Sequence, residues 1–167
     1  LVKHGVDQMA RAGRCRRLLA RVLIVGGGCR GQALARALRA AGHAVRGTTR
    51  DPARTAAIAA AGAEPYVGDP DRIGTLMDAL AGVTIVCWLM GTVPVPELHE
   101  GRLRMLWEKL VDTPVRGVVY EGALPQGEQV ARTAAQTWQI PLEVLDADPL
   151  DHDAWLPAAR AAIDRLL

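Results

Sequence analysis

Hydrophobic positions along this chain fall into short unbroken runs that alternate with longer segments rich in Ala and Leu. The runs Val22–Val25 and Ile85–Leu89 are apolar at every position, as in parallel strands that are covered on both faces. Together with weaker β-branched runs they predict six strands, at Arg21–Val25, Ala44–Thr48, Glu64–Val67, Thr84–Leu89, Gly117–Tyr120 and Leu142–Asp146. The segments between and after them predict six helices, at Gly31–Ala41, Pro52–Ala61, Arg72–Leu80, Glu97–Val111, Gln126–Gln139 and Asp151–Leu167.

The residues at the ends of the predicted helices agree with this alternation. Asp51 and Pro52 place a capping carboxylate before a proline at the first helical position. Gly42 and Gly62 follow helical segments, where a left-handed residue commonly ends a helix. Strands that alternate with helices in this way predict an α/β fold, with an open, doubly wound parallel sheet in three layers and strand order 3-2-1-4-5-6.

Length and composition are those of one globular domain. The chain has 167 residues, of which 50% are hydrophobic, a share that excludes a disordered chain. It contains no apolar run of about 20 residues, the length that a membrane-spanning helix requires. Residues 1–20 differ from the rest because Arg11, Arg14, Arg16 and Arg17 gather there without the apolar stretch of a secretory signal. They predict a basic leader, either solvated or touching an acidic partner, ahead of a single domain at residues 21–167.

Charge and cysteine content exclude further classes of protein. The formal net charge of +2 is too small to indicate a nucleic-acid-binding protein. The three cysteines, Cys15, Cys29 and Cys87, are odd in number and lack the spacing of metal ligands. They favour a reducing, cytoplasmic setting, and no metal site is expected.

The segment with the clearest chemistry is the glycine pattern Gly26-x-Gly28-x-x-Gly31, between the first predicted strand and the first predicted helix. In this context Gly26 permits a tight turn, Gly28 lets a pyrophosphate approach the backbone, and Gly31 lets the helix pack close to the strand. Amide groups at the start of the helix then face the phosphates, whose charge the helix dipole favours. The pattern predicts a dinucleotide-binding site of the Rossmann type; the alternative is a glycine-rich turn that merely packs well.

The residues around this pattern indicate which dinucleotide is preferred. An NAD site usually places Asp or Glu at the end of the second strand, where this chain has Thr48 and Thr49, followed by Arg50. A carboxylate would repel a 2′-phosphate, whereas hydroxyl groups and a guanidinium bind one. We therefore expect NADP rather than NAD, unless Arg50 only pairs with Asp51 on the surface. Cys29 and Arg30 lie inside the loop, and Arg30 either contacts a phosphate or points into solvent.

These motifs resemble those of a known family. Residues Arg21–Gly91 are similar to the nucleotide-binding half of an atypical short-chain dehydrogenase/reductase, of the kind related to nucleoside-diphosphate-sugar epimerases. The similarity lies in VLIVGGGCRGQALARAL, GHAVRGTTRDPAR and GAEPYVGDPDRIGTLMDALAGVTIVCWL, in this order along the chain. It implies that Asp69 and Pro70 lie beside the adenine of the cofactor. It also implies that Leu89, Met90 and Gly91 line the nicotinamide ribose.

The chain departs from this family where catalysis is concerned. Catalytic members use a Tyr and a Lys four residues apart, but four residues after Tyr66 and Tyr120 stand Pro70 and Leu124. The predicted sheet uses up the chain, so no separate substrate domain is expected. If the protein has chemistry of its own, the sequence offers Tyr120, Glu121 and His99 near the expected site. Plainer interpretations are a half-buried tyrosine, a turn-capping glutamate and a solvated histidine.

Two further features leave alternatives open. The acidic residues around His152 are Asp146, Asp148, Asp151 and Asp153, and they are typical of a turn and a helix N-terminus rather than of a metal site. The segment Glu97–Val111 carries apolar residues at helical spacing, and Trp107 and Met105 widen the stripe. This helix either packs into the core or forms a homodimer interface.

We therefore predict an NADP-binding Rossmann protein that senses the cofactor or regulates a partner without catalysis. The first alternative is an NADPH-dependent reductase or epimerase-like enzyme acting on a small carbonyl or sugar-like substrate. The second is a structural subunit with a vestigial nucleotide site.

Overall fold

The structure, a computed structural model, describes residues 19–167. The predicted basic leader at residues 1–20 lies outside this part except for its last two residues.

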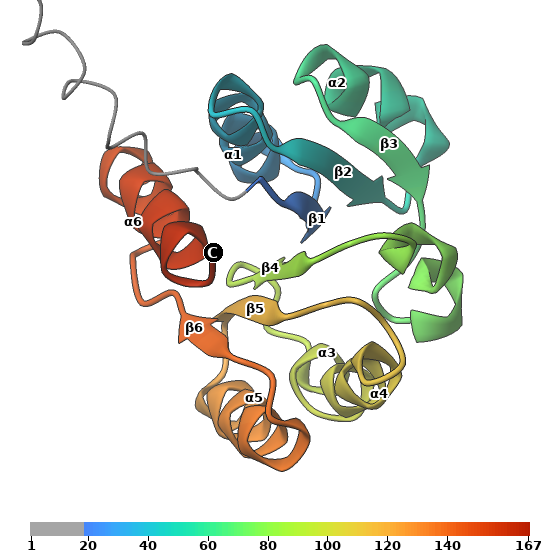
Figure 1. Cartoon of the computed structure of the whole chain (residues 1–167). Helices are drawn as coiled ribbons and strands as arrows, with labels where there is room; N and C mark the ends of the chain where they lie inside the picture. Colours follow the sequence, from blue (N-terminus) through green and yellow to red (C-terminus); the bar gives the residue numbers. More distant parts are fainter. Residues whose placement is uncertain (1–18) are drawn as a thin grey trace, which may run out of the picture.

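A six-stranded parallel sheet forms the centre of the domain (Figure 1). Its strands are β1 (Arg21–Val25), β2 (Ala44–Thr49), β3 (Glu64–Val67), β4 (Ile85–Met90), β5 (Gly117–Gly122) and β6 (Leu142–Val144). They stand in the order β3-β2-β1-β4-β5-β6. The predicted fold class and strand order are confirmed, because unbroken apolar runs such as β4 are buried at every position.

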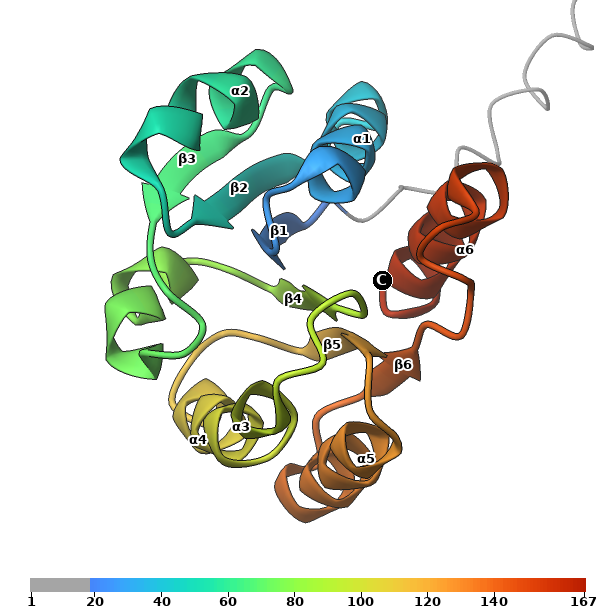
Figure 2. The ribbon, with the colours of Figure 1, turned by 180° about the vertical axis from the view of Figure 1, so that it is seen from behind.

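Helices cover both faces of the sheet (Figures 1 and 2). On one face α1 (Cys29–Ala40), α2 (Thr55–Ala60) and α6 (His152–Arg165) supply residues to one apolar core. On the other face α3 (Pro96–His99), α4 (Gly101–Leu110) and α5 (Pro125–Trp138) supply a second core. Short 3₁₀ segments complete the chain: η1 (Pro52–Arg54), η2 (Ile73–Leu76) and η3 (Asp78–Leu80). The result is the predicted three-layer arrangement.

The helix ends follow the predicted chemistry. The Asp51 carboxylate accepts a hydrogen bond from the Ala53 amide, at 2.9 Å, in front of Pro52. Gly42 and Gly62 have φ values of +95° and +83°, a conformation that glycine adopts without a steric penalty. Each of these glycines follows the end of a helix, and the chain then continues into the next strand.

Two predicted helices were wrong in part. The segment Arg72–Leu80 forms two 3₁₀ turns instead of a helix. There the Thr75 hydroxyl bonds to the main chain of Asp69 and Arg72 and competes with helical hydrogen bonds. The segment Glu97–Val111 is divided at Glu100, whose φ and ψ of −124° and −89° are not helical. Within residues 19–167, none of the helices combines the length and the apolar composition needed to cross a lipid bilayer.

Candidate functional site

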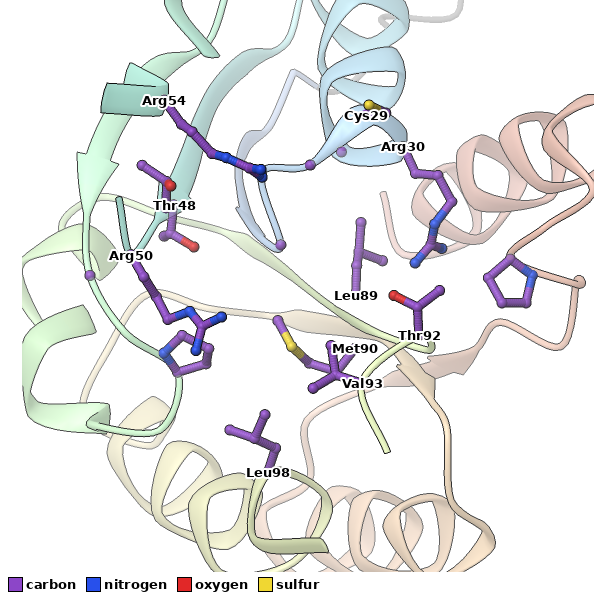
Figure 3. A pocket seen from close by; sticks show the side chains of 18 of the residues that line it. Cys29, Arg30, Thr48, Arg50, Arg54, Leu89, Met90, Thr92, Val93 and Leu98 are labelled. Carbon is purple, nitrogen blue, oxygen red and sulfur yellow. The ribbon is translucent and has the colours of Figure 1, made fainter. Parts of the chain in front are cut away.

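A cavity of about 450 Å³ opens at the carboxyl ends of β1, β2 and β4 (Figure 3). It lies where the chain order in the sheet reverses, between the strands that run outward to β3 and those that run outward to β6. Open α/β sheets bind their ligands at this point. The glycine loop, the end of β2, the end of β4 and the segment before α6 all contribute to its lining.

Each predicted glycine has the geometry that its assigned role requires. Gly26 has a φ of +117°, and a side chain there would approach the Leu89 carbonyl oxygen to 2.8 Å. A Cβ at Gly31 would overlap the Gly26 carbonyl oxygen, so α1 packs against the loop only because this residue has no side chain. Gly28 faces open space, with no atom within 4 Å of the position that a Cβ would occupy. The loop therefore leaves its outer surface bare for a ligand.

The amide groups at the start of α1 are the polar surface of this loop. No side chain caps the helix, whose N-cap residue is Gly28, so the first-turn amides of Cys29, Arg30 and Gly31 have no partner within the helix. Gly27 differs, because its amide donates to the Thr48 carbonyl oxygen at 3.0 Å and ties the loop to β2. An anion at the loop would meet the helix N-terminus, where the dipole favours negative charge.

The β2 side of the cavity is cationic. Arg50 and Arg54 line it, both are exposed, and neither makes an ion pair within residues 19–167. In Figure 3 they reach from the β2 side toward the cavity. The expected surface pair between Arg50 and Asp51 is not formed, since Asp51 caps the η1 segment instead. Thr48 and Thr49 also line this side.

The β4 side of the cavity is mainly apolar. Leu89 and Met90 line it as predicted, together with Thr92, Val93 and Leu98. Two of the predicted site residues lie outside the lining. At Gly91, the Glu121 side chain occupies the position that a Cβ would take. Asp69 bonds through its carboxylate to the Asp71 amide, at 3.0 Å, while its neighbours Gly68 and Pro70 line the cavity.

Arg30 neither points freely into solvent nor lies unpaired in the loop. Its Nη1 donates to both carboxylate oxygens of Glu121, at 2.6 and 2.7 Å. The side chain of Glu121 is 2% exposed and that of Arg30 is 13% exposed. The guanidinium also lies over the Trp155 ring of α6, 4.9 Å from its centroid, a cation–π contact. The plainer interpretation of Glu121 as a turn cap was wrong, because Glu121 anchors the glycine loop to β5.

Tyr120 and His99 form a second buried polar group. Tyr120 Oη lies 3.1 Å from His99 Nδ1, and His99 Nε2 lies 2.7 Å from the Val93 carbonyl oxygen. Side chains at Gly122 or Gly127 would collide with the tyrosine hydroxyl. Burial, reinforced by the charge of Glu128, raises the pKa of Tyr120 to about 12. His99 is fully buried, so the interpretation of a solvated histidine was wrong.

Several lining residues were missed by sequence reasoning: Gly27, Arg54, Gly68, Thr92, Val93, Leu98, Pro149, Leu150 and His152. Arg54 had a usable signal, because it follows Arg50 by four positions in the short segment after β2, where a second cation would lie near the same edge. The segment 149–152 had none, because it comes from the far end of the chain. In the helix left between core packing and a homodimer interface, Leu103, Leu106, Trp107 and Leu110 are buried in the core, whereas Met105 is exposed.

The acidic residues near the C-terminus have structural partners. The Asp148 carboxylate accepts from the Leu150 amide, and that of Asp151 caps α6 at the Ala154 amide. Among the described residues, no group of three or more His, Cys, Asp or Glu side chains is arranged to hold a metal ion. Cys29 is exposed at the cavity, while Cys87 is buried, which raises the pKa of its thiol to about 12.

Comparison with known proteins agrees with this geometry. The sequence profile of a family described as NAD(P)H-binding matches residues 26–147. No curated protein matches the sequence.

Among solved structures, the chain is similar to the Citrobacter sp. triphenylmethane reductase complexed with NADP(H), at 20% identity and a TM-score of 0.58 over 74% of this chain and 48% of that one. It is also similar to an NADPH-dependent quinone oxidoreductase from Escherichia coli complexed with NADPH, at 18% identity and a TM-score of 0.59 over 74% and 47%. Vestitone reductase from alfalfa is similar at 13% identity and a TM-score of 0.59, over 75% of this chain and 55% of that one. The chain spans about half the length of these proteins, and at such identities the similarity shows the fold.

Proposed function

Because this chain belongs to the NAD(P)H-binding family, we propose that it binds NADP(H) in the cavity at the glycine loop and acts as a cofactor sensor or regulatory partner subunit without catalysis of its own. The observation that carries the choice of NADP is the pair Arg50 and Arg54. Both are exposed at the end of β2 without an ion-pair partner in the described part of the chain, at the edge where NAD sites hold a carboxylate.

In the proposed binding mode, each part of the dinucleotide meets its own residues. The amides of Cys29, Arg30 and Gly31 receive the pyrophosphate, and the bare surface of Gly28 lets it approach. Thr48, Thr49, Arg50 and Arg54 surround the 2′-phosphate, and Gly68 and Pro70 lie beside the adenine, with Asp69 next to them. Leu89 and Met90 end β4 on the opposite side and line the cavity where the nicotinamide ribose belongs, and Gly91 follows them outside the lining.

The state of the three candidate catalytic side chains supports the absence of catalysis. Glu121 is held by Arg30, and both ring nitrogens of His99 are engaged. The Tyr120 hydroxyl is enclosed by glycines, and a pKa of about 12 makes it a poor proton donor. A proton-transfer step in the cavity would need a group that these residues do not provide.

The alternative is an NADPH-dependent reductase. It is favoured by His152, which is exposed, begins α6 and lines the cavity, since imidazole can pass a proton near neutral pH. The solved structures similar to this chain include a triphenylmethane reductase and a quinone oxidoreductase. Hydride transfer mainly requires a positioned cofactor and a proton source. A structural subunit with a vestigial site remains the second alternative, disfavoured by the open cavity.

A cytoplasmic location and a homodimer complete the proposal. The apolar surface available for a dimer interface is smaller than the sequence indicated. Its exposed large hydrophobic residues are Met105 on α4, Val111 directly after α4, and Trp138 at the end of α5.

Calorimetric titration with NADPH and NADH tests the proposal. We expect tight binding of NADPH, weaker binding of NADH, and no NADPH oxidation with carbonyl, quinone or triphenylmethane substrates. NADPH oxidation that His152→Ala abolishes would establish the reductase alternative. Failure to bind either nucleotide would leave the structural subunit.

A further inference from the structure

His99 has no role in the proposed function, yet it is bonded to a residue that lines the cavity. It is fully buried, and it ends α3, directly after Leu98, which lines the cavity. Its Nε2 lies 2.7 Å from the carbonyl oxygen of Val93, which also lines the cavity. The imidazole of His99 therefore contacts the loop of residues 91–95, and Leu98, the residue just before His99, also lines the cavity.

The partners of His99 fix its tautomer. A carbonyl oxygen only accepts hydrogen bonds, so Nε2 carries the proton and donates to Val93. Nδ1 of the neutral ring then accepts from the Tyr120 hydroxyl, at 3.1 Å. Tyr120 cannot move aside, because Gly122 and Gly127 close around its hydroxyl. The imidazole is thereby held from β5 in one orientation and presents its N–H to the loop.

The loop makes few main-chain hydrogen bonds. Within the described residues, the Val93 amide donates to the Met90 carbonyl oxygen at 3.0 Å, and the Leu98 amide donates to that of Val95 at 3.1 Å. Two side chains tie the loop to the rest of the domain within residues 19–167: that of Val93 packs against the core, and that of His99 bonds to the Val93 carbonyl oxygen. Residues 92, 94 and 95 of the loop are exposed, so both ties act at Val93.

We propose that His99 is a positioning residue for the nicotinamide half of the bound cofactor, which it serves by fixing the loop of residues 91–95 through Val93. The proposal rests on the proposed NADP(H) site. The pyrophosphate lies at the start of α1 and the 2′-phosphate at the end of β2, so the other half of the dinucleotide extends toward β4. His99 acts on that half and has no contact with the β2 side.

The experiment separates the two halves of the cofactor. NADPH carries both, whereas 2′,5′-ADP carries the adenine, its ribose and the 2′-phosphate and lacks the nicotinamide. For His99→Leu, we expect the NADPH affinity to fall about tenfold, the scale of one hydrogen bond, and the 2′,5′-ADP affinity to stay within about twofold. A variant that only weakens the fold would lower both.

Two conservative variants keep the test decisive if the leucine variant folds poorly. Gln places a donor near the position of Nε2 and reaches Val93, so His99→Gln restores most of the NADPH affinity. Asn places its amide near the position of Nδ1 and reaches only Tyr120, so His99→Asn should lose as much NADPH affinity as His99→Leu. His43→Leu is the matched control. His43 is another buried histidine, and its Nδ1 accepts a hydrogen bond from the Ala20 amide at 3.1 Å. It precedes β2 and so lies at the amino ends of the strands, away from the cavity. It should change the two affinities equally or not at all.

Equal losses for NADPH and 2′,5′-ADP in His99→Leu, or unchanged affinities for both, would overturn the positioning role. If Gln and Asn gave the same loss, the contact with Val93 would not be its basis. If the unchanged protein bound neither ligand, the proposed function itself would fail, an outcome distinct from the others.

Discussion

The polar side chains on the two sides of the cavity differ in their exposure and in their partners. On the β2 side, Arg50 and Arg54 are exposed and have no ion-pair partner within residues 19–167. On the side of β4 and β5, Arg30, Glu121, Tyr120 and His99 are buried or nearly so, and they are bonded to one another or to the main chain. One side keeps charge available for a ligand, while the other uses its polar groups to hold the walls. This contrast is the basis of the proposal that the cavity binds a dinucleotide without catalysis.

The largest expected effect tests the structural role of the β5 side. Glu121→Ala leaves the buried Arg30 guanidinium without its counter-charge, which costs about 3–5 kcal/mol in the free energy of unfolding. Urea denaturation measures this loss. In the matched control, Glu143→Ala removes the carboxylate of a more exposed pair with Arg165 and should cost less than about 1 kcal/mol. If the two losses were equal, Glu121 would not be the anchor that distinguishes the two sides.

The β2 side is tested by cofactor discrimination. Arg50→Ala should weaken NADPH binding by about 1.5–3 kcal/mol, the scale of a hydrogen bond to a charged group, and leave NADH nearly unchanged. Calorimetry with both nucleotides measures this difference. Arg160→Ala removes an exposed arginine of α6 that does not line the cavity, and it should leave both affinities alone. Equal losses for NADPH and NADH in Arg50→Ala would contradict contact with the 2′-phosphate.

Alkaline pH probes the closed side. Burial raises the pKa of Tyr120 to about 12 from the ordinary tyrosine value of 10.0. Between these values the unfolded chain loses the phenolic proton and the folded protein keeps it, so stability is fully present below pH 10 and is lost as the pH rises toward 12. Two pH units correspond to about 2–3 kcal/mol.

Urea midpoints measured from pH 9 to 12 should show this decline. Part of it belongs to Cys87, whose pKa is also raised to about 12, so Cys87→Ala is the background for the comparison. On that background Tyr120→Phe should flatten the remaining decline above pH 10. An unchanged slope would mean that the hydroxyl is reached by solvent and is not enclosed.

The smallest effect concerns the open face of the glycine loop. Gly28→Ala adds a methyl group where no atom lies within 4 Å, so the free energy of unfolding should barely change. NADPH affinity should fall by about 1 kcal/mol or more, because the methyl group separates the pyrophosphate from the amides. Gly74→Ala also adds a methyl group to open space, away from the cavity, and should leave binding unchanged. If both variants bound NADPH normally, the phosphates would not lie at Gly28.

The sequence predicted what depends on local pattern. Every strand was found, because β1 and β4 are apolar at nearly every position and the weaker strands follow from the alternation with helices. The glycine loop and Arg50 were also placed at the cavity, from their positions after β1 and β2. The split of the expected helix at Glu100 and the 3₁₀ turns around Thr75 were missed, because helical periodicity does not register such competing local bonds.

The rest could not be read from the sequence because it depends on contacts between distant segments. Arg30 and Glu121 are 91 positions apart, and nothing local marks them as partners. Pro149, Leu150 and His152 reach the cavity only because the chain crosses from the edge strand β6 back to α6, which packs beside α1. The sequence left Tyr120 and His99 between a catalytic and a plainer interpretation, because the hydrogen bond between them joins residues 21 positions apart.

The placement of β1 in the sheet has a kinetic consequence. Its two neighbours are β2 and β4, and the bond that joins Arg21 to Thr84 spans 63 positions of the chain. The entropy of closing that long loop must be overcome before the central pair can form. We therefore expect slow refolding compared with helical domains of this length, with β1 and β2 exposing an unpaired edge until β4 arrives.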